Sequence, residues 1–164
     1  RIDFEKMATM TSAIELIGQL LHDDEVNEPL FDFSKKMLTW LNEADIHPPQ
    51  IFPYLQIRLA GLTGIGLQLD VKGSQEKTNY LNLESGLITD ESVSSHSYKL
   101  TQNQHTYVKL AMQAKSSRLF ELPFETGELK ALIEILDRYL KYHVEGLRDR
   151  KSDAIFEQIL QESL

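Results

Sequence analysis

Apolar residues recur at steps of three and four along several stretches of the chain, which is the spacing of one buried helix face. The first stretch is residues 7–21, where the expected inward stripe is Met7, Met10, Ile14, Ile17 and Leu21. A second helix is expected to begin at Asn27, a capping residue with a proline two positions later, and to run to about residue 41. Because the loop between them is short, we expect these two helices to lie antiparallel.

Residues 51–62 are apolar on nearly all sides. A helix without a polar face is usually buried, so we place this one at the centre of a bundle. Further helices are expected at about residues 103–114, 126–143 and 152–160, with Thr126 capping the long one. The long helix has the cleanest apolar stripe, made of Leu129, Leu132, Ile133, Leu136 and Leu140.

The helical period fades between residues 67 and 89. Residues 80–83 and 87–88, separated by a Glu-Ser-Gly turn, predict a small β-hairpin or finger, and residues 89–97 predict a loop. The predicted fold class is therefore all-α, a bundle of about six helices with a small β insertion at about residues 66–97. Residues 1–164 suit one domain with one core.

Composition narrows the functional classes. No apolar run approaches the ~20 residues that cross a bilayer, so we expect no membrane association and a cytoplasmic protein. The chain has no cysteine, which excludes disulfides and thiolate metal sites. The net charge of −8 repels nucleic acid, so contact with DNA needs a local basic patch or a part outside this sequence. The chain begins with Arg1 instead of methionine, and we therefore expect a fragment of a longer protein.

Three short motifs invite a catalytic reading, and each lacks a necessary element. His22-Asp23 is similar to the metal-binding pair of HD phosphohydrolases, but the other histidines fall in different predicted elements. Ser94-Ser95-His96 lacks the strained elbow that exposes a nucleophile, and the glycines at 61–73 lack the P-loop pattern. We therefore expect no enzymatic activity, no metal and no cofactor.

Cationic and aromatic side chains gather at the end of the long helix and just beyond it. Together with Arg58, the candidate contacts for a partner or DNA are Tyr139, Lys141, His143, Arg148, Arg150 and Lys151. Arginine and lysine here suit a phosphate backbone or an acidic peptide. The alternatives are a solvated helix end for the cations, a core position for Tyr139 and a structural salt bridge for Arg58.

Three blocks occur in a familiar order: residues 53–59 with a glycine-bearing turn at 61–66, then residues 80–86, then residues 139–143 with Lys151-Ser152 behind them. In this order the blocks resemble the C-terminal helical domain of the RecO recombination mediators, over roughly residues 3–160. The resemblance implies a preceding OB-fold and a protein that binds and anneals single- and double-stranded DNA, mostly through that missing N-terminal part.

The resemblance also implies partners. With RecR, a RecO protein loads RecA recombinase onto DNA coated by single-strand-binding protein, and it docks the acidic, hydrophobic C-terminal tail of that coating protein. We expect this tail to bind a groove between helices near Arg58 and residues 139–151. The alternative is a helical protein-interaction scaffold with no role on DNA.

Many RecO proteins bind zinc through two cysteine pairs in the finger. Those pairs would fall near residues 69–73 and after Gly86, and this sequence has neither. The chain therefore resembles a zinc-free branch, whose finger is expected to be held by packing alone.

Overall fold

The computed structural model describes residues 4–21, 26–70, 78–92, 95–114, 116–144 and 146–147. Arg148, Arg150, Lys151 and the predicted helix at 152–160 lie outside this part of the chain, as do His22-Asp23 and Ser94. The described part contains five helices of 11 to 17 residues and one four-residue helix. Their bounds are α1 Phe4–Leu20, α2 Glu28–Glu43, α3 Ile51–Leu62, α4 Gln102–Met112, α5 Ser116–Leu119 and α6 Glu128–His143.

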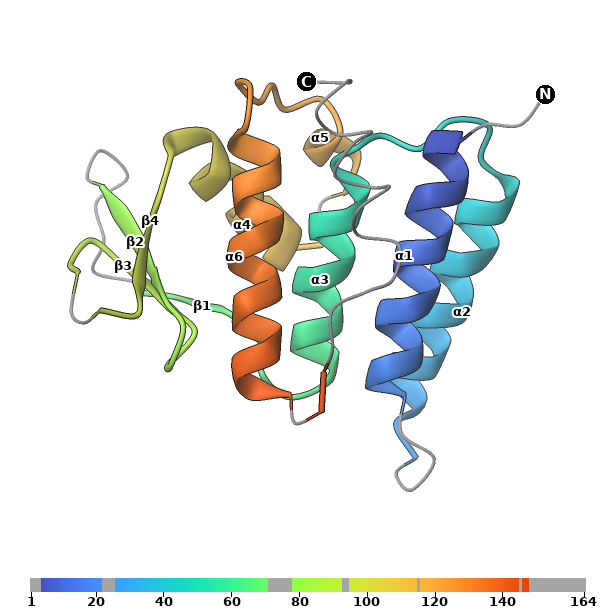
Figure 1. The fold of residues 1–164 in the computed structure, drawn as a ribbon, viewed down its shortest axis with the longest axis horizontal. Helices are drawn as coiled ribbons and strands as arrows, with labels where there is room; N and C mark the ends of the chain where they lie inside the picture. The colour runs from blue at the N-terminus through green and yellow to red at the C-terminus, as the bar shows by residue number, and fades with distance from the viewer. Residues whose placement is uncertain are drawn as a thin grey trace.

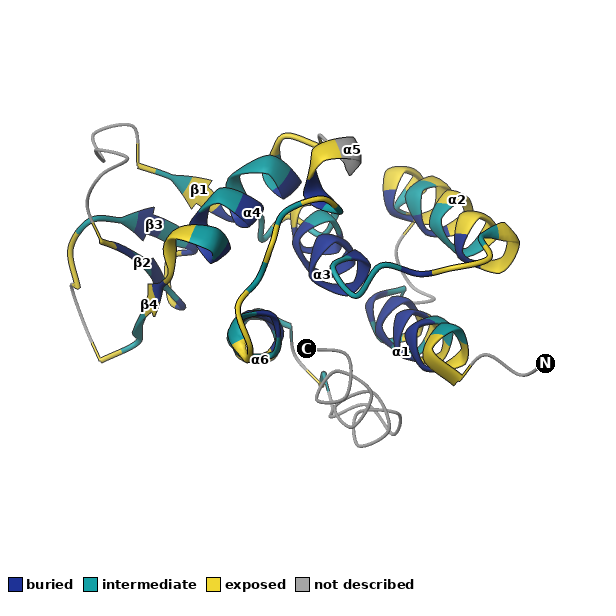
Figure 2. Cartoon of the chain, turned by 90° about the horizontal axis from the view of Figure 1, so that it is seen from above, coloured by how far each residue is buried: buried dark blue, intermediate teal, exposed yellow. Residues whose placement is uncertain are grey.

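The helices are arranged side by side around α3 (Figure 1). The antiparallel pair α1 and α2 lies on one side of α3, and α4 and α6 lie on the other. Figure 2 shows α3 buried on nearly all sides, while α2 exposes the face that points away from it. Phe52, Leu55 and Leu59 are fully buried, so the predicted central position of this helix is confirmed.

The start of α2 also agrees with its sequence signal. The side-chain oxygen of Asn27 accepts a hydrogen bond from the Leu30 amide at 3.0 Å, with a proline in the first turn. In α6 the predicted aliphatic stripe is buried, but the predicted cap is wrong. The N-cap is Gly127, in the left-handed region at φ 85°, and it makes no side-chain cap bond. Instead, the Glu128 carboxylate accepts from the Glu125 amide at 2.8 Å.

The predicted inward face of α1 is confirmed at Ile17, which is buried, but it is wrong at Met7 and Ile14. Met7 and Ile14 are more than half exposed, whereas the buried positions include Ala8, Ser12 and Ala13 beside Leu16. These small side chains let the backbone of α1 approach α2 and α3 closely. Close packing here outweighs the burial of the larger residues that the periodicity favoured.

A four-stranded mixed sheet forms the other end of the molecule. Its strands are β1 Gln68–Leu69, β2 Asn79–Asn82, β3 Leu87–Thr89 and β4 Ser97–Leu100. Their order is β1-β3-β2-β4, with β1 parallel to β3 and the other neighbours antiparallel.

The sheet corrects the predicted fold class. The β2–β3 hairpin was expected, but an all-α bundle was wrong, because two further strands pair with its edges. The described residues of the expected loop at 89–97 lie between β3 and β4 and overlap these strands only at Thr89 and Ser97. The strand β4, which was not expected, pairs with β2 from Asn79↔Leu100 to Asn82↔Ser97. Strands this short have no period of their own to detect, and pairing with a neighbour defines them.

None of the helices in the described ranges is both long and apolar enough to cross a membrane.

Candidate functional site

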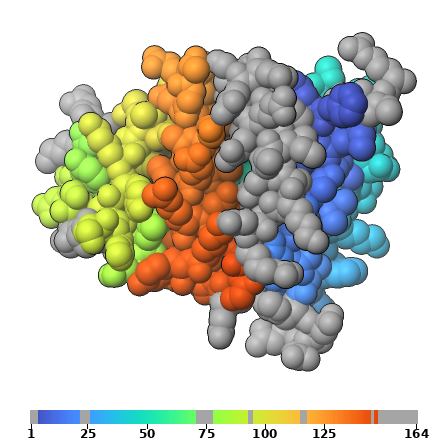
Figure 3. Space-filling view, viewed as in Figure 1, coloured from blue at the N-terminus to red at the C-terminus, as the bar shows by residue number. Residues whose placement is uncertain are grey.

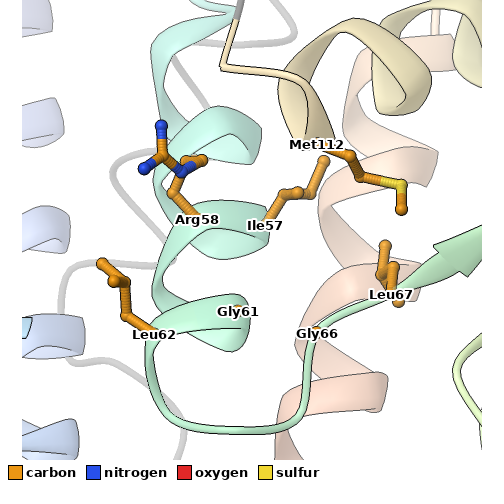
Figure 4. Close-up of a pocket in the computed structure, with 7 residues that line it drawn as sticks. All are labelled: Ile57, Arg58, Gly61, Leu62, Gly66, Leu67 and Met112. Carbon is orange, nitrogen blue, oxygen red and sulfur yellow. The ribbon is translucent and has the colours of Figure 1, made fainter.

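A groove lies beside the C-terminal half of α3, between this helix, the turn that follows it and the end of α4 (Figure 4). It has a volume of about 220 Å³ and is lined by Ile57, Arg58, Gly61, Leu62, Gly66, Leu67 and Met112. The lining comes from α3, from the turn that follows it and from α4. Among these lining residues Arg58 carries a charge, Gly61 and Gly66 have no side chain, and the others are apolar.

Two glycines make the groove. Gly61 lies on the exposed side of α3, where an added Cβ would meet nothing within 4 Å. In Figure 4 it lies between Leu62 on one side and Leu67 on the other, so its missing side chain leaves the floor open. Gly66 approaches so closely that its added Cβ would lie 3.2 Å from the Gly61 Cα. The groove is therefore shaped by backbone contact, and a larger residue at 61 would fill it.

Arg58 provides the charge of this site. Its guanidinium carbon lies 5.0 Å from the ring centre of Phe33 on α2 and 5.8 Å from that of Tyr54 on α3. One guanidinium nitrogen donates to the Tyr54 hydroxyl at 3.1 Å. Among the described residues no carboxylate pairs with Arg58, so the structural salt bridge offered as an alternative is not found there. A partly buried guanidinium held by two rings keeps donors for an anionic ligand.

Tyr139 is not on the surface. It is 2% exposed, as the core alternative expects, and burial raises the pKa of its phenol. Its hydroxyl donates a hydrogen bond to the Ile65 carbonyl in the turn that follows α3. Tyr139 therefore touches the segment that forms the groove wall, not a ligand directly.

His143 is also engaged within the protein. Its Nε2 lies 2.7 Å from the Leu83 carbonyl in the turn between β2 and β3, and its ring packs against Tyr139 and Tyr142. Lys141 and Tyr142 are exposed on the surface of α6, which runs beside the sheet in Figure 3. Of the predicted site residues that the structure describes, only Arg58 lines the groove, and Tyr139 contacts the segment that forms its wall.

The cluster of cationic and aromatic side chains predicted at the end of the long helix is not found among the described residues. Arg148, Arg150 and Lys151 lie outside them, and their role as partner or DNA contacts remains a prediction. Within the described ranges no three His, Asp or Glu side chains gather to hold a metal ion. The groove residues that the sequence analysis missed include Gly61, Gly66 and Met112. The signal for Gly61 was its position three residues after Arg58, on the same face of a buried helix.

The comparisons with known proteins agree on one family. The model of the family described as "Recombination protein O C terminal" matches residues 1–153. The chain belongs to this family. The family predicted from the three blocks is thereby confirmed.

Three relatives are each named DNA repair protein RecO. The protein of Flavobacterium psychrophilum is 24% identical over 147 residues, which cover 88% of this chain and 58% of the relative. That of Flavobacterium johnsoniae is 25% identical, covering 96% of this chain and 62% of the relative. That of Pelodictyon phaeoclathratiforme is 24% identical, covering 96% and 67% respectively. The chain thus spans about three fifths of the length of the first two relatives, and no solved structure matches it.

Proposed function

We propose that this chain is the partner-docking domain of a RecO-type mediator of DNA repair by recombination. Its role is to hold the acidic, hydrophobic C-terminal tail of single-strand-binding protein in the Arg58 groove, without bond-breaking chemistry. Membership of the family and relatives named as DNA repair proteins support the setting. DNA annealing, contact with RecR and the loading of RecA belong to the whole protein and are part of the same proposal.

The main support for this docking site is the combination of one cation with an apolar groove. Arg58 presents a cation to the edge of an otherwise apolar groove, and within the described chain it is balanced by aromatic rings and not by a carboxylate. A peptide that combines acidic residues with an apolar end complements both properties. The groove, at about 220 Å³, is smaller than the roughly 300–1,000 Å³ typical of small-molecule sites, and it suits one or two side chains of a peptide.

The net charge also favours peptide docking over DNA binding as the role of this domain. The net charge of −8 disfavours binding of a polyanion over the whole surface, so the described domain is expected to bind DNA weakly by itself. A short acidic peptide needs only one or two cations. The domain therefore fits a docking role better than a DNA-gripping role.

The test is a titration of a fluorescent synthetic peptide, acidic and ending in apolar residues, with the 164-residue chain. Arg58→Met is expected to weaken binding by about tenfold or more, because a charge-assisted hydrogen bond contributes roughly 1.5–3 kcal/mol. Gly61→Leu is expected to abolish binding by filling the groove floor, without strain since its φ is an ordinary helical one. Lys35→Met, which removes an equal charge from the exposed surface of α2, is the matched control.

Equal affinity in wild type, Arg58→Met and Gly61→Leu would remove the groove as the docking site. Absence of peptide binding by the wild type, together with no binding to DNA, would favour the helical scaffold with no role on DNA.

A further inference from the structure

One wall of the Arg58 groove is a short segment, residues 65–68, between the end of α3 and the start of β1. Its start is held by a hydrogen bond from the Ile65 amide to the Ala60 carbonyl at 3.0 Å. Its end enters β1, which is only two residues long and pairs with β3 through Gln68↔Leu87 and Leu69↔Ile88. The Gln68 amide donates to the Gly86 carbonyl at 2.9 Å. A hydrogen bond therefore joins this wall directly to the turn of the β2–β3 hairpin.

Tyr139 joins the same point from α6. Its hydroxyl donates to the Ile65 carbonyl at the start of the wall, while the hydroxyl edge of its ring lies under Gly86 at the far side. An added Cβ at Gly86 would stand 2.6 Å from the Tyr139 hydroxyl oxygen, closer than real Cβ contacts allow. Gly86 also has φ 74°, which favours glycine. Only a glycine lets the hairpin turn rest on the tyrosine.

The wall, the hairpin turn and α6 thus meet at one buried hydroxyl. If the turn lifts away, Gln68 loses its bond to Gly86, and Tyr139 is freed to move from Ile65. If the wall moves outward, the β1–β3 pairing must follow it, because β1 begins at the residue after Leu67.

We infer that Tyr139 and Gly86 are positioning residues for the Arg58 groove, so that its occupancy and the docking of the β2–β3 turn are coupled. The inference rests on the proposed peptide docking only for the nature of the ligand. A peptide pressed against Gly66 and Leu67 stabilises the docked turn, and by linkage a docked turn strengthens peptide binding by the same factor. A partner that binds the hairpin would thereby change the affinity of the groove for the peptide.

The first test needs no ligand. In the full chain, the methyl groups of Leu67 and Met112, which both line the groove, report on it by NMR. Gly86→Ala and Tyr139→Phe are expected to shift both methyl resonances. Gly127→Ala is the matched control, because Gly127 has a similar φ of 85° and nothing within 4 Å of an added Cβ. Methyl shifts as small in Gly86→Ala and Tyr139→Phe as in Gly127→Ala would overturn the inference.

The second test uses the acidic, apolar-ended peptide. Tyr139→Phe, which keeps the ring and removes only the hydroxyl, is expected to weaken binding roughly fivefold or more while leaving the helical circular dichroism unchanged. Peptide added to wild type is expected to slow hydrogen exchange at the amides of Gln68 and Leu87. Unchanged affinity in Tyr139→Phe and unchanged exchange in wild type would contradict the coupling.

The two proposals fail separately. If the peptide does not bind wild type but the methyl resonances respond to Gly86→Ala and Tyr139→Phe, the docking proposal fails and the positioning role stands. If the peptide binds and the variants change neither the methyl resonances nor the affinity, the docking proposal stands and the positioning role fails.

Discussion

The helical half of the molecule and its sheet are stabilised in different ways. The helices bury whole aliphatic and aromatic side chains, such as Leu55, Leu129 and Leu132 at 0% exposure. The sheet has strands of two to four residues. Hydrogen bonds join α6 to the β2–β3 turn, from His143 to the Leu83 carbonyl, and to the segment before β1, from Tyr139 to the Ile65 carbonyl. One helix therefore stabilises both halves: α6 fills the core with its aliphatic stripe and contacts the hairpin turn through His143 in its last turn.

This answers the question raised by the missing cysteines. A zinc-free finger was expected to be held by packing alone. Packing is part of the answer, since Leu81 and Ile88 are buried. A hydrogen bond from His143 to Leu83 in the hairpin turn, and one from Tyr139 to Ile65 in the segment before β1, add fixed points that packing by itself does not provide.

We expect the greatest loss of stability from a substitution in the core of the helical half. Leu132→Ala removes a fully buried side chain at the centre of α6, and is expected to cost about 2–5 kcal/mol of unfolding free energy. Urea denaturation followed by circular dichroism measures it. Glu134→Ala, an exposed position on the same helix, is the control and should change little. A loss no greater than that of the control would contradict the assigned core.

The next prediction concerns the joint between the two halves, where β4 passes into α4. Thr101 caps α4 in a reciprocal capping box, in which its hydroxyl accepts from the Gln104 amide at 3.2 Å. Thr101→Ala is expected to cost about 0.5–2 kcal/mol, and Thr101→Ser should retain most of the stability. The two variants are compared by thermal unfolding. Equal losses for alanine and serine would show that the hydroxyl is not the stabilising group.

A smaller effect is expected in the sheet half. His143→Phe keeps a ring against Tyr139 and Tyr142 but removes the bond to the Leu83 carbonyl. The expected cost is about 0.5–1.5 kcal/mol, and faster hydrogen exchange should be confined to the hairpin. Tyr142→Phe, which removes the hydroxyl of the exposed tyrosine just before His143, is the control. Faster exchange spread equally over α3 and α6 would show that the sheet is not held separately.

The smallest expected effect is a pH dependence in the helical half. Burial, and then the nearby charge of Lys109, lowers the pKa of His105 below its ordinary value of 6.5. Between the lowered pKa and 6.5 the unfolded chain binds more protons than the folded one, so stability falls as the pH falls through this window. Denaturation at pH 7.5 and 5.5 should show a smaller decrease for His105→Gln than for wild type. An identical decrease would remove His105 as the cause.

Part of this fold followed from local signals. The Asn27 cap, the buried α3 and the stripe of α6 depend on side chains a few residues apart, and the structure agrees with each. The hairpin turn at Glu84-Ser85-Gly86 was equally local. For the candidate site, Arg58 was found as a lone charge in an apolar helix, since such a charge needs a surface or a partner.

Other features depended on contacts between distant residues. The exposure of Met7 and Ile14 was missed because α1 packs through its small residues, and β1 and β4 were missed because pairing defines them. A groove near Arg58 was expected, but its lining by Gly61, Gly66 and Met112 was not, because an absent side chain at Gly61 leaves its floor open.

Local sequence patterns were enough to predict the five longer helices of the described chain, the hairpin and the family, because periodicity and motif order depend on neighbouring residues. The short helix α5 was not predicted, and the helix expected at 152–160 lies outside the described residues. The tertiary structure alone decided that Tyr139 supports a groove wall, that Arg58 rests on Phe33 and that the hairpin grows into a sheet. The two side-chain contacts join residues 25 positions apart (Arg58 and Phe33) and 74 positions apart (Tyr139 and Ile65), and no local pattern encodes which distant group a side chain will meet.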